Sequence, residues 1–143
     1  MLDRKTCFER GLLRHVTPSE EKGRMSLNKS KAVLDEAEKN LGVEALDSCV
    51  VSSYTAMFHS ARAILFRDGV REKSHYCVAR YLELYVERGD LEQKWIDLLD
   101  RIRDVRHAGQ YDLSHSGTRE EAESCLKTAH DFTERMQALI GMV

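Results

Sequence analysis

The near absence of proline is the feature that most constrains the fold of this chain. Pro18 is the single proline in 143 residues, and there are only eight glycines. A β-sandwich or barrel turns every ~8–12 residues and uses both residue types to do so, whereas long helices need almost none. The sequence therefore predicts an all-α fold. Since one domain commonly takes ~100–150 residues, residues 1–143 are expected to form a single domain.

Helix start and stop signals divide the chain into six segments. A short helix is expected over residues 7–16. Thr17 then caps a second helix, with Pro18 at its first position, Glu20 closing a capping box and Gly42 ending it. The remaining helices are predicted at 46–67, 74–88, 91–107 and 118–143, with a loop over 108–117. Short connections between them predict an antiparallel up-and-down bundle of five to six helices.

The segment 46–67 has the pattern of a central helix. Its apolar face includes Val50, Met57 and Ile64, and the opposite face is small and weakly polar, with Ala56 and Ala63. A helix that is apolar or small nearly all round is normally buried among others. A second subunit could help to cover the small face and Phe66, which suggests a dimer, although the other helices of the same chain could suffice.

Composition and charge exclude several classes of protein. Twenty-two basic residues against 24 acidic residues give a formal charge of −2, which does not fit a non-specific nucleic-acid binder, although a local basic patch is possible. The first residues lack the apolar region of a signal peptide, and no run of ~18 apolar residues is free of charge. We therefore expect a cytoplasmic protein without a membrane span.

The four cysteines are widely spaced and form no CxxC pair (Cys7, Cys49, Cys77 and Cys125). Structural zinc needs clustered ligands, so no metal site is predicted. No cofactor is predicted either. Buried free thiols in a reducing cytosol are the favoured interpretation.

Arginines gather at the end of the 91–107 segment. At ~100° per residue, Arg106 falls on the apolar stripe near Leu99 and Ile102. Burying a charge without a partner is costly, so an anionic group is expected to meet Arg106. Alternatively the helix frays there, and Arg106 reaches water or the last carbonyl groups.

Two further arginines and a histidine lie close by in sequence: Arg101, Arg103 and His107. They could form an anion-binding patch with Arg106. Aspartates at positions 97, 100 and 104 alternate with them, however, and can pair three or four residues away. A solvated, salt-bridged face is therefore favoured for Arg101 and Arg103.

Two histidines stand in informative places. His59, near Arg62 on the central helix, fits a hydrogen-bonded core histidine better than a ligand. Ser74 is a plausible N-cap, and His75 behind it is expected to be exposed. The sequence holds no phosphate-cradling glycine loop, GxSxG or HExxH motif, so most familiar enzyme classes lack their signature.

Residues 53–65, SYTAMFHSARAIL, resemble the central-helix signature of the HEPN domain family. Lys73-Ser74-His75 and the string RHAGQYD over 106–112 follow in the same order and at similar distances, and the resemblance spans roughly residues 8–140. It implies a helical bundle, usually a homodimer, whose gene often neighbours that of a minimal nucleotidyltransferase, the two acting as toxin and antitoxin. Active members are metal-independent ribonucleases that use an arginine followed, four to six residues later, by a histidine.

Two registers of this motif are possible. In the favoured one, Arg106 matches the arginine, His107 matches the polar residue after it, and Tyr111 stands in place of the histidine. In the other, Arg101 and His107 have the right spacing, but Ile102 is then not polar and Arg101 lies off the apolar stripe. Tyrosine titrates near ~10 and histidine near ~6.5, so tyrosine is a poor general base at neutral pH.

Three functions follow as hypotheses. The favoured one is a nucleotide- or nucleic-acid-associated module that dimerises and partners a minimal nucleotidyltransferase. The second is a ribonuclease toxin in which Arg106 stabilises the phosphate while His107 or Tyr111 transfers or positions a proton. In both, the phosphate-binding candidates are His59, Arg62, His75 and Arg103. The third is a purely structural helical dimer.

Overall fold

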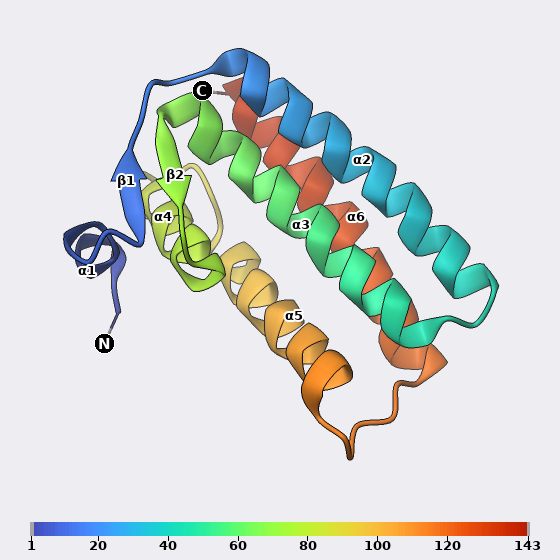
Figure 1. The fold of residues 1–143 in the computed structure, drawn as a ribbon. Coiled ribbons are helices and arrows are strands. Elements are labelled where there is room, and N and C mark those ends of the chain that lie inside the picture. Colours follow the sequence, from blue (N-terminus) through green and yellow to red (C-terminus); the bar gives the residue numbers. More distant parts are fainter. Residues whose placement is uncertain (1, 143) are drawn as a thin grey trace.

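The computed structural model describes residues 2–142, and these residues form six helices and one two-stranded ribbon (Figure 1). The elements in chain order are α1 (Arg4–Glu9), β1 (Leu13–His15), α2 (Glu20–Gly42), α3 (Leu46–Asp68), β2 (Val70–Glu72), α4 (His75–Glu87), α5 (Gln93–Tyr111) and α6 (Arg119–Met142). The predicted all-α bundle is thereby confirmed, since the ribbon is its sole departure among these residues.

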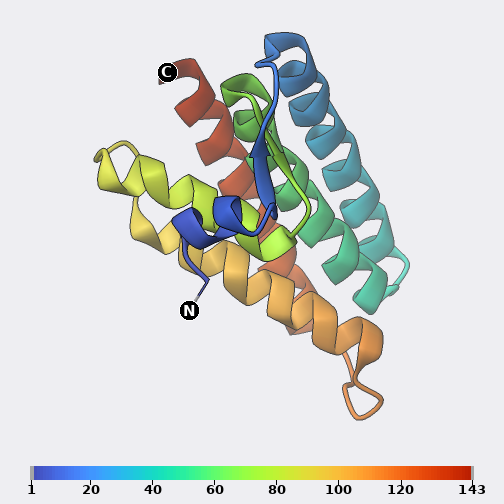
Figure 2. The ribbon, with the colours of Figure 1, turned by 60° about the vertical axis from the view of Figure 1, so that its left-hand side comes forward.

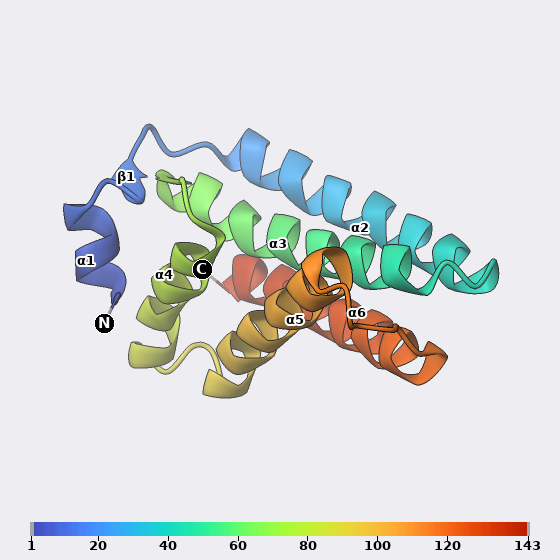
Figure 3. The same cartoon turned by 60° about the horizontal axis from the view of Figure 1, so that its bottom comes forward.

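Helix α3 lies at the centre, as its pattern predicts. It contacts α2, α4, α5 and α6, and α4 and α5 lie on the side of α3 away from α2 (Figure 3). The small face of α3 packs against small residues of α2: Ser26 Oγ and Ser30 Oγ each donate to a carbonyl of α3, those of His59 and Ala56, at 2.7 Å. This face is therefore covered within one chain and does not require a second subunit.

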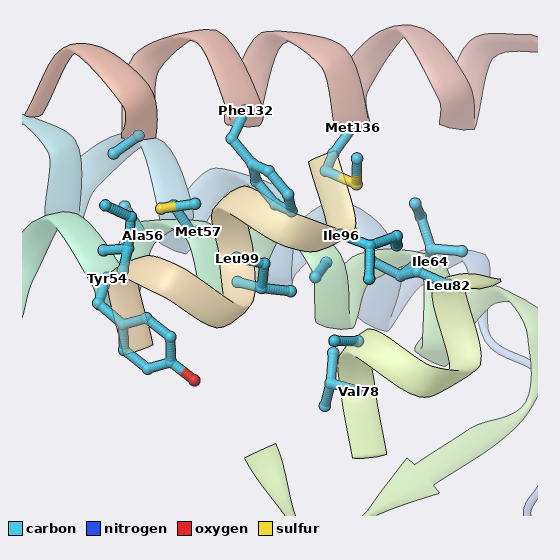
Figure 4. Packing of buried hydrophobic residues seen from close by; sticks show 14 of the residues in the cluster. Tyr54, Ala56, Met57, Ile64, Val78, Leu82, Ile96, Leu99, Phe132 and Met136 are labelled. Carbon is cyan, nitrogen blue, oxygen red and sulfur yellow. The ribbon is translucent and has the colours of Figure 1, made fainter. Parts of the chain in front are cut away.

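The core is built where α3, α4, α5 and α6 meet (Figure 4). Phe132 and Met136 of α6 are fully buried against side chains from the other three helices. The labelled partners in that layer are Tyr54, Ala56, Met57, Ile64, Val78, Leu82, Ile96 and Leu99. Within residues 2–142, no helix has the length and apolar character needed to cross a bilayer.

The N-terminal arm differs from the prediction of a helix over residues 7–16. Helix α1 ends at Glu9, Gly11 turns the chain with a φ of +71°, and β1 pairs with β2 in an antiparallel ribbon. Leu13 is fully buried, so the segment is fixed by a tertiary contact that its short apolar pattern did not reveal. Figure 2 shows the arm lying across α4.

Four helix boundaries test the predicted signals. Ser74 and Thr118 cap α4 and α6 as predicted, since their hydroxyls accept from Cys77 N and Glu121 N. The cap of α2 is Ser19 and not Thr17, because Ser19 Oγ accepts from Lys22 N. Helix α5 continues past residue 107 to Tyr111, so the predicted loop begins four residues later than expected.

The prediction of four free thiols is wrong for two of them. Cys7 of α1 and Cys77 of α4 form a disulfide with a Cα–Cα distance of 6.0 Å. Cys49 and Cys125 are free and buried, as predicted. Seventy residues separate the bonded pair, and sequence spacing alone cannot reveal which distant residues the fold brings together. The bond fastens the N-terminal arm to α4.

Gly69 offers a test of the junction between α3 and the ribbon. Gly69 and Gly89 both have a φ of +81°. A Cβ added to Gly69 would lie 2.6 Å from the carbonyl oxygen of Val16, whereas a Cβ added to Gly89 would have no atom of the described neighbours within 4 Å. We expect both alanine variants to lose about 1–2 kcal/mol of unfolding free energy for the left-handed backbone. Gly69→Ala should lose about 1–3 kcal/mol more. Urea unfolding measures this, and equal losses would contradict the clash.

Candidate functional site

Arg106 is a half-buried cation to which the described residues offer no counter-charge. Its guanidinium lies over the ring of Tyr54, 4.9 Å from the ring centroid. Its Nε is buried and makes no hydrogen bond within the described chain, and no ion pair joins Arg106 to these residues. The expected anionic partner is thus not a side chain within residues 2–142. Fraying does not explain the position either, because α5 continues for five residues beyond it.

Tyr54 links Arg106 to His75. The Tyr54 hydroxyl and His75 Nδ1 share a hydrogen bond of 3.0 Å, and the two rings are stacked with centroids 5.8 Å apart. Phe58 lies one turn after Tyr54 on α3. Its ring stacks on His75, with the two ring centroids 4.0 Å apart. Helices α3, α4 and α5 therefore each contribute a side chain to one cluster, which we call the Tyr54 cluster: Tyr54, Phe58, His75 and Arg106.

The surroundings of the Tyr54 cluster keep both titratable groups neutral near pH 7. Partial burial lowers the pKa of His75, and the charges of Arg106, Arg103 and Arg62 lower it further against an opposing effect of Glu72. Burial raises the pKa of Tyr54 to about 12, although Arg103 and Arg106 act in the opposite direction. His75 can therefore accept a proton, while Tyr54 keeps its own.

Arg62 borders the cluster on the side of the ribbon. It forms an ion pair with Glu72 of β2, and its guanidinium lies over Phe66 at 4.8 Å and Phe58 at 5.7 Å. Next to it is a shallow hollow of about 260 Å³. The hollow is lined by Phe58, Arg62, Arg71, Glu72, Lys73 and His75.

His59 does not fit the prediction of a hydrogen-bonded core histidine. It is half-buried, its ring meets Phe58 edge-on at 5.7 Å, and its side chain makes no hydrogen bond within residues 2–142. Burial lowers the pKa of His59, followed by the charge of Arg62. His59 therefore lies beside Phe58, which lines the hollow, but it takes no part in the hydrogen bond between Tyr54 and His75.

The salt-bridged interpretation is confirmed for Arg103 and not for Arg101. Arg103 Nη1 donates to Asp100 Oδ1 at 2.8 Å, and its guanidinium lies 5.1 Å from the centroid of the Tyr76 ring. Arg101 is exposed and forms no ion pair with another described residue. Arg103 thus adds positive charge near the Tyr54 cluster while remaining paired.

His107 and Tyr111 lie apart from the Tyr54 cluster. Both are exposed on α5, and their ring centroids are 4.9 Å from one another. No hydrogen bond or ring contact within the described chain joins either residue to Arg106 or His75. The structure therefore brings together Arg106, Arg62, Arg103 and His75 of the predicted site residues.

Tyr54 and Phe58 were not predicted as site residues. Tyr54 lies on the apolar face of the central helix, where its hydroxyl needs a polar partner. The need for a polar partner could have marked Tyr54 as a site residue. Its partner could not be named from the sequence, because His75 is 21 residues away on another helix.

Comparison with known proteins identifies the class of molecule. A family model described as HEPN domain matches residues 24–139. The chain belongs to the HEPN domain family, and its bundle is the HEPN fold expected from the resemblance. Residues 1–23, which include α1 and β1, lie before the matched region.

Three archaeal relatives are similar over most of their length. A protein of Methanocaldococcus jannaschii named "Putative toxin MJ0605" is 29% identical over 115 residues, covering 75% of this chain and 85% of the relative. A UPF0332 protein of Archaeoglobus fulgidus is 24% identical, covering 82% and 94%. "Putative toxin MJ0142" of Methanocaldococcus jannaschii is 23% identical, covering 76% and 75%.

Coupling between Arg106 and His75 can be measured by NMR titration. Since the charge of Arg106 helps to lower the pKa of His75, Arg106→Gln should raise that pKa toward the ordinary histidine value. Lys31→Gln is a matched control, because Lys31 is exposed on α2 and forms no ion pair with a described residue. An unchanged His75 titration in Arg106→Gln would contradict the arrangement.

The lowered pKa of His75 also predicts that the stability of the fold depends on pH. A histidine whose folded pKa lies below its unfolded value of about 6.5 binds fewer protons in the native state. We expect the stability contributed by neutral His75 to be present above about pH 6.5 and to be lost as the pH falls toward the folded pKa. Urea unfolding from pH 7.5 to 5 should show a smaller loss in His75→Gln than in wild type.

Proposed function

We propose that this protein is a HEPN-type module that binds RNA or a nucleotide through a phosphate at Arg106. The observation that carries the proposal is the half-buried Arg106 guanidinium, which the described residues leave without a counter-charge. A buried cation is costly unless it is paired and hydrogen-bonded. A phosphate oxygen supplies both, and arginine suits phosphate because its planar donors can bind two oxygens at once.

The neighbours of Arg106 fit the rest of a nucleotide. His75, exposed at the start of α4, presents a neutral ring stacked on Phe58, which could extend to a base. Arg62 borders the hollow beside this pair, His59 adjoins Phe58, and Arg103 raises the local positive potential. Binding would therefore be local, which suits a chain with a formal charge of −2.

The biological setting we propose follows the family. Two relatives carry names that call them toxins, and the resemblance implies a homodimer and a minimal nucleotidyltransferase as partner. We propose a toxin–antitoxin-like pair of this kind in the cytoplasm. A dimer with α5 at its interface would bring two copies of Arg106 toward one cleft and would cover the exposed Tyr111 and Leu113.

A second candidate function is a metal-independent ribonuclease, and His75 is the observation that favours it. In that reaction a 2′-OH attacks the adjacent phosphorus and loses its proton to a base. The P–O5′ bond then breaks, and the leaving oxygen takes a proton from the protonated base or from water, which leaves a 2′,3′-cyclic phosphate and a 5′-OH. Arg106 would stabilise the charged phosphorane. His75, with its pKa lowered, is a better candidate base than Tyr111, while His107 remains the candidate named by the motif.

Binding to a fluorescent single-stranded RNA, followed by anisotropy, tests the proposal. Arg106→Gln should weaken binding by about 10- to 150-fold, because charged hydrogen bonds contribute about 1.5–3 kcal/mol. Lys31→Gln should bind as wild type does. If instead Arg106→Leu is neutral or stabilising and no variant changes binding, the purely structural alternative is correct.

The same RNA, incubated with wild-type protein in excess EDTA and resolved on a gel, decides between binding and cleavage. A ribonuclease should cut it, with the activity lost in Arg106→Ala. Loss in His75→Ala but not in His107→Ala would assign the base to the Tyr54 cluster. Intact RNA with retained binding supports the module without catalysis. Light scattering and co-purification with a neighbouring nucleotidyltransferase test the dimer and the partner.

A further inference from the structure

We infer that the ribbon of β1 and β2 extends the proposed site into a binding surface for the backbone of single-stranded RNA. This inference rests on the proposed function and adds Arg14 and Arg71 to it, two residues that the arginine–histidine motif does not include. The surface, which we call the arginine ribbon, consists of Arg14 on β1 and Arg71 on β2, with Phe66, Arg62 and Lys73 beside them.

The pairing of the two strands brings like charges together. Arg14 lies directly opposite Arg71 in the antiparallel register, so both side chains project from the same face of the ribbon. Both are exposed, whereas Leu13 and Val70 of the opposite face are buried. Like charges directly opposite one another destabilise a strand pair. An anionic ligand that bridges them would turn this unfavourable pair into a binding site.

The arginine ribbon is continuous with the Tyr54 cluster. The guanidinium of Arg71 lies 6.0 Å from the centroid of the Phe66 ring, and that of Arg62 lies 4.8 Å from it. Arg62 and Arg71 then line the hollow together with Lys73 and His75. His75 leads through Tyr54 to Arg106. Cations and aromatic rings thus form one series of contacts along a path from the ribbon to α5.

The charge of this path is positive despite one carboxylate. Glu72 lines the hollow, but its side chain is only 6% exposed and it pairs with Arg62 and, at 3.7 Å, with Arg71. The exposed groups of the path are therefore Arg14, Arg71, Lys73 and the ring of His75. A groove that follows a backbone with cations and offers rings for stacking is typical of single-strand binding.

The ribbon is a rigid support and not a loose tail. The Cys7–Cys77 disulfide fastens α1 to α4, two residues after His75, and Leu13 is fully buried. The residue after β1 is joined to the residue before β2, since Val16 N donates to Gly69 O at 2.9 Å. Because β1 precedes the matched region, which begins at residue 24, this half of the surface lies outside that region.

Single-stranded RNA fits this surface better than a duplex does. The rings of His75 and Phe66 can stack only on bases that are not already paired and stacked within a helix. The phosphates would lie along the arginines, and the path would end at Arg106. An acidic peptide would use the charges but leave the exposed ring of His75 unused.

The test compares Arg14→Gln/Arg71→Gln with Arg106→Gln and Lys31→Gln in anisotropy titrations of a fluorescent single-stranded RNA at several salt concentrations. We expect the double variant to bind about tenfold more weakly, with a salt slope smaller by about 1.4, because each lost phosphate contact of a single strand contributes about 0.7. Its thermal midpoint should stay close to that of wild type, because the loss of the like-charge repulsion offsets the loss of the Arg71–Glu72 ion pair, so unfolding cannot explain the weaker binding. Lys31→Gln should change neither quantity.

The possible failures are distinguishable. If Arg106→Gln weakens binding but the double variant has wild-type affinity and slope, the arginine ribbon is not a binding surface while the proposed function stands. If wild type binds no RNA, the arginine ribbon is overturned as an RNA-binding surface, and the proposed function is overturned in its RNA-binding form. Equal or tighter binding of an RNA duplex of the same length, or displacement of the strand by an equimolar poly-glutamate peptide, would overturn the assignment to single-stranded RNA.

Discussion

The contact between α3 and α2 is the constraint on which the rest of the structure depends. Two buried serines of α2 donate hydrogen bonds to carbonyls on the small face of α3. These bonds fix the orientation of the central helix, with its small face toward α2. A helix presents its faces at fixed angles, so the opposite faces, with Tyr54 and Phe58, are then directed toward α4 and α5. The candidate site follows from this orientation of α3 and needs no irregular backbone.

Arg106 illustrates how a fold can hold a charge that it does not neutralise. The face of an aromatic ring attracts a cation but is a weaker partner than a carboxylate, so the guanidinium is held over Tyr54 while its capacity to bind an anion remains. Tyr54 also holds His75 by a hydrogen bond. One buried tyrosine therefore positions both Arg106, which we assign to phosphate binding, and His75 beside it, and burial keeps the tyrosine's own proton in place.

Much of the fold could be predicted from the sequence, and less of the site. The scarcity of proline can be read from the composition. The helical periodicity and the caps at Ser74 and Thr118 depend only on residues close in sequence, so they could also be recognised directly. The ribbon and the disulfide between Cys7 and Cys77 could not, because both join segments far apart in sequence. The small face of α3 suggested a second subunit, yet α2 covers it.

The sequence by itself determined a helical bundle with α3 at its centre, its resemblance to the HEPN family and the unusual place of Arg106 on an apolar stripe. These conclusions rest on local periodicity and on strings of adjacent residues. Tertiary structure alone decided that Arg106 meets Tyr54 and His75, that His107 and Tyr111 stand apart, and that Arg14 faces Arg71. The physical reason is that such contacts depend on how whole helices and strands pack, which no single segment specifies.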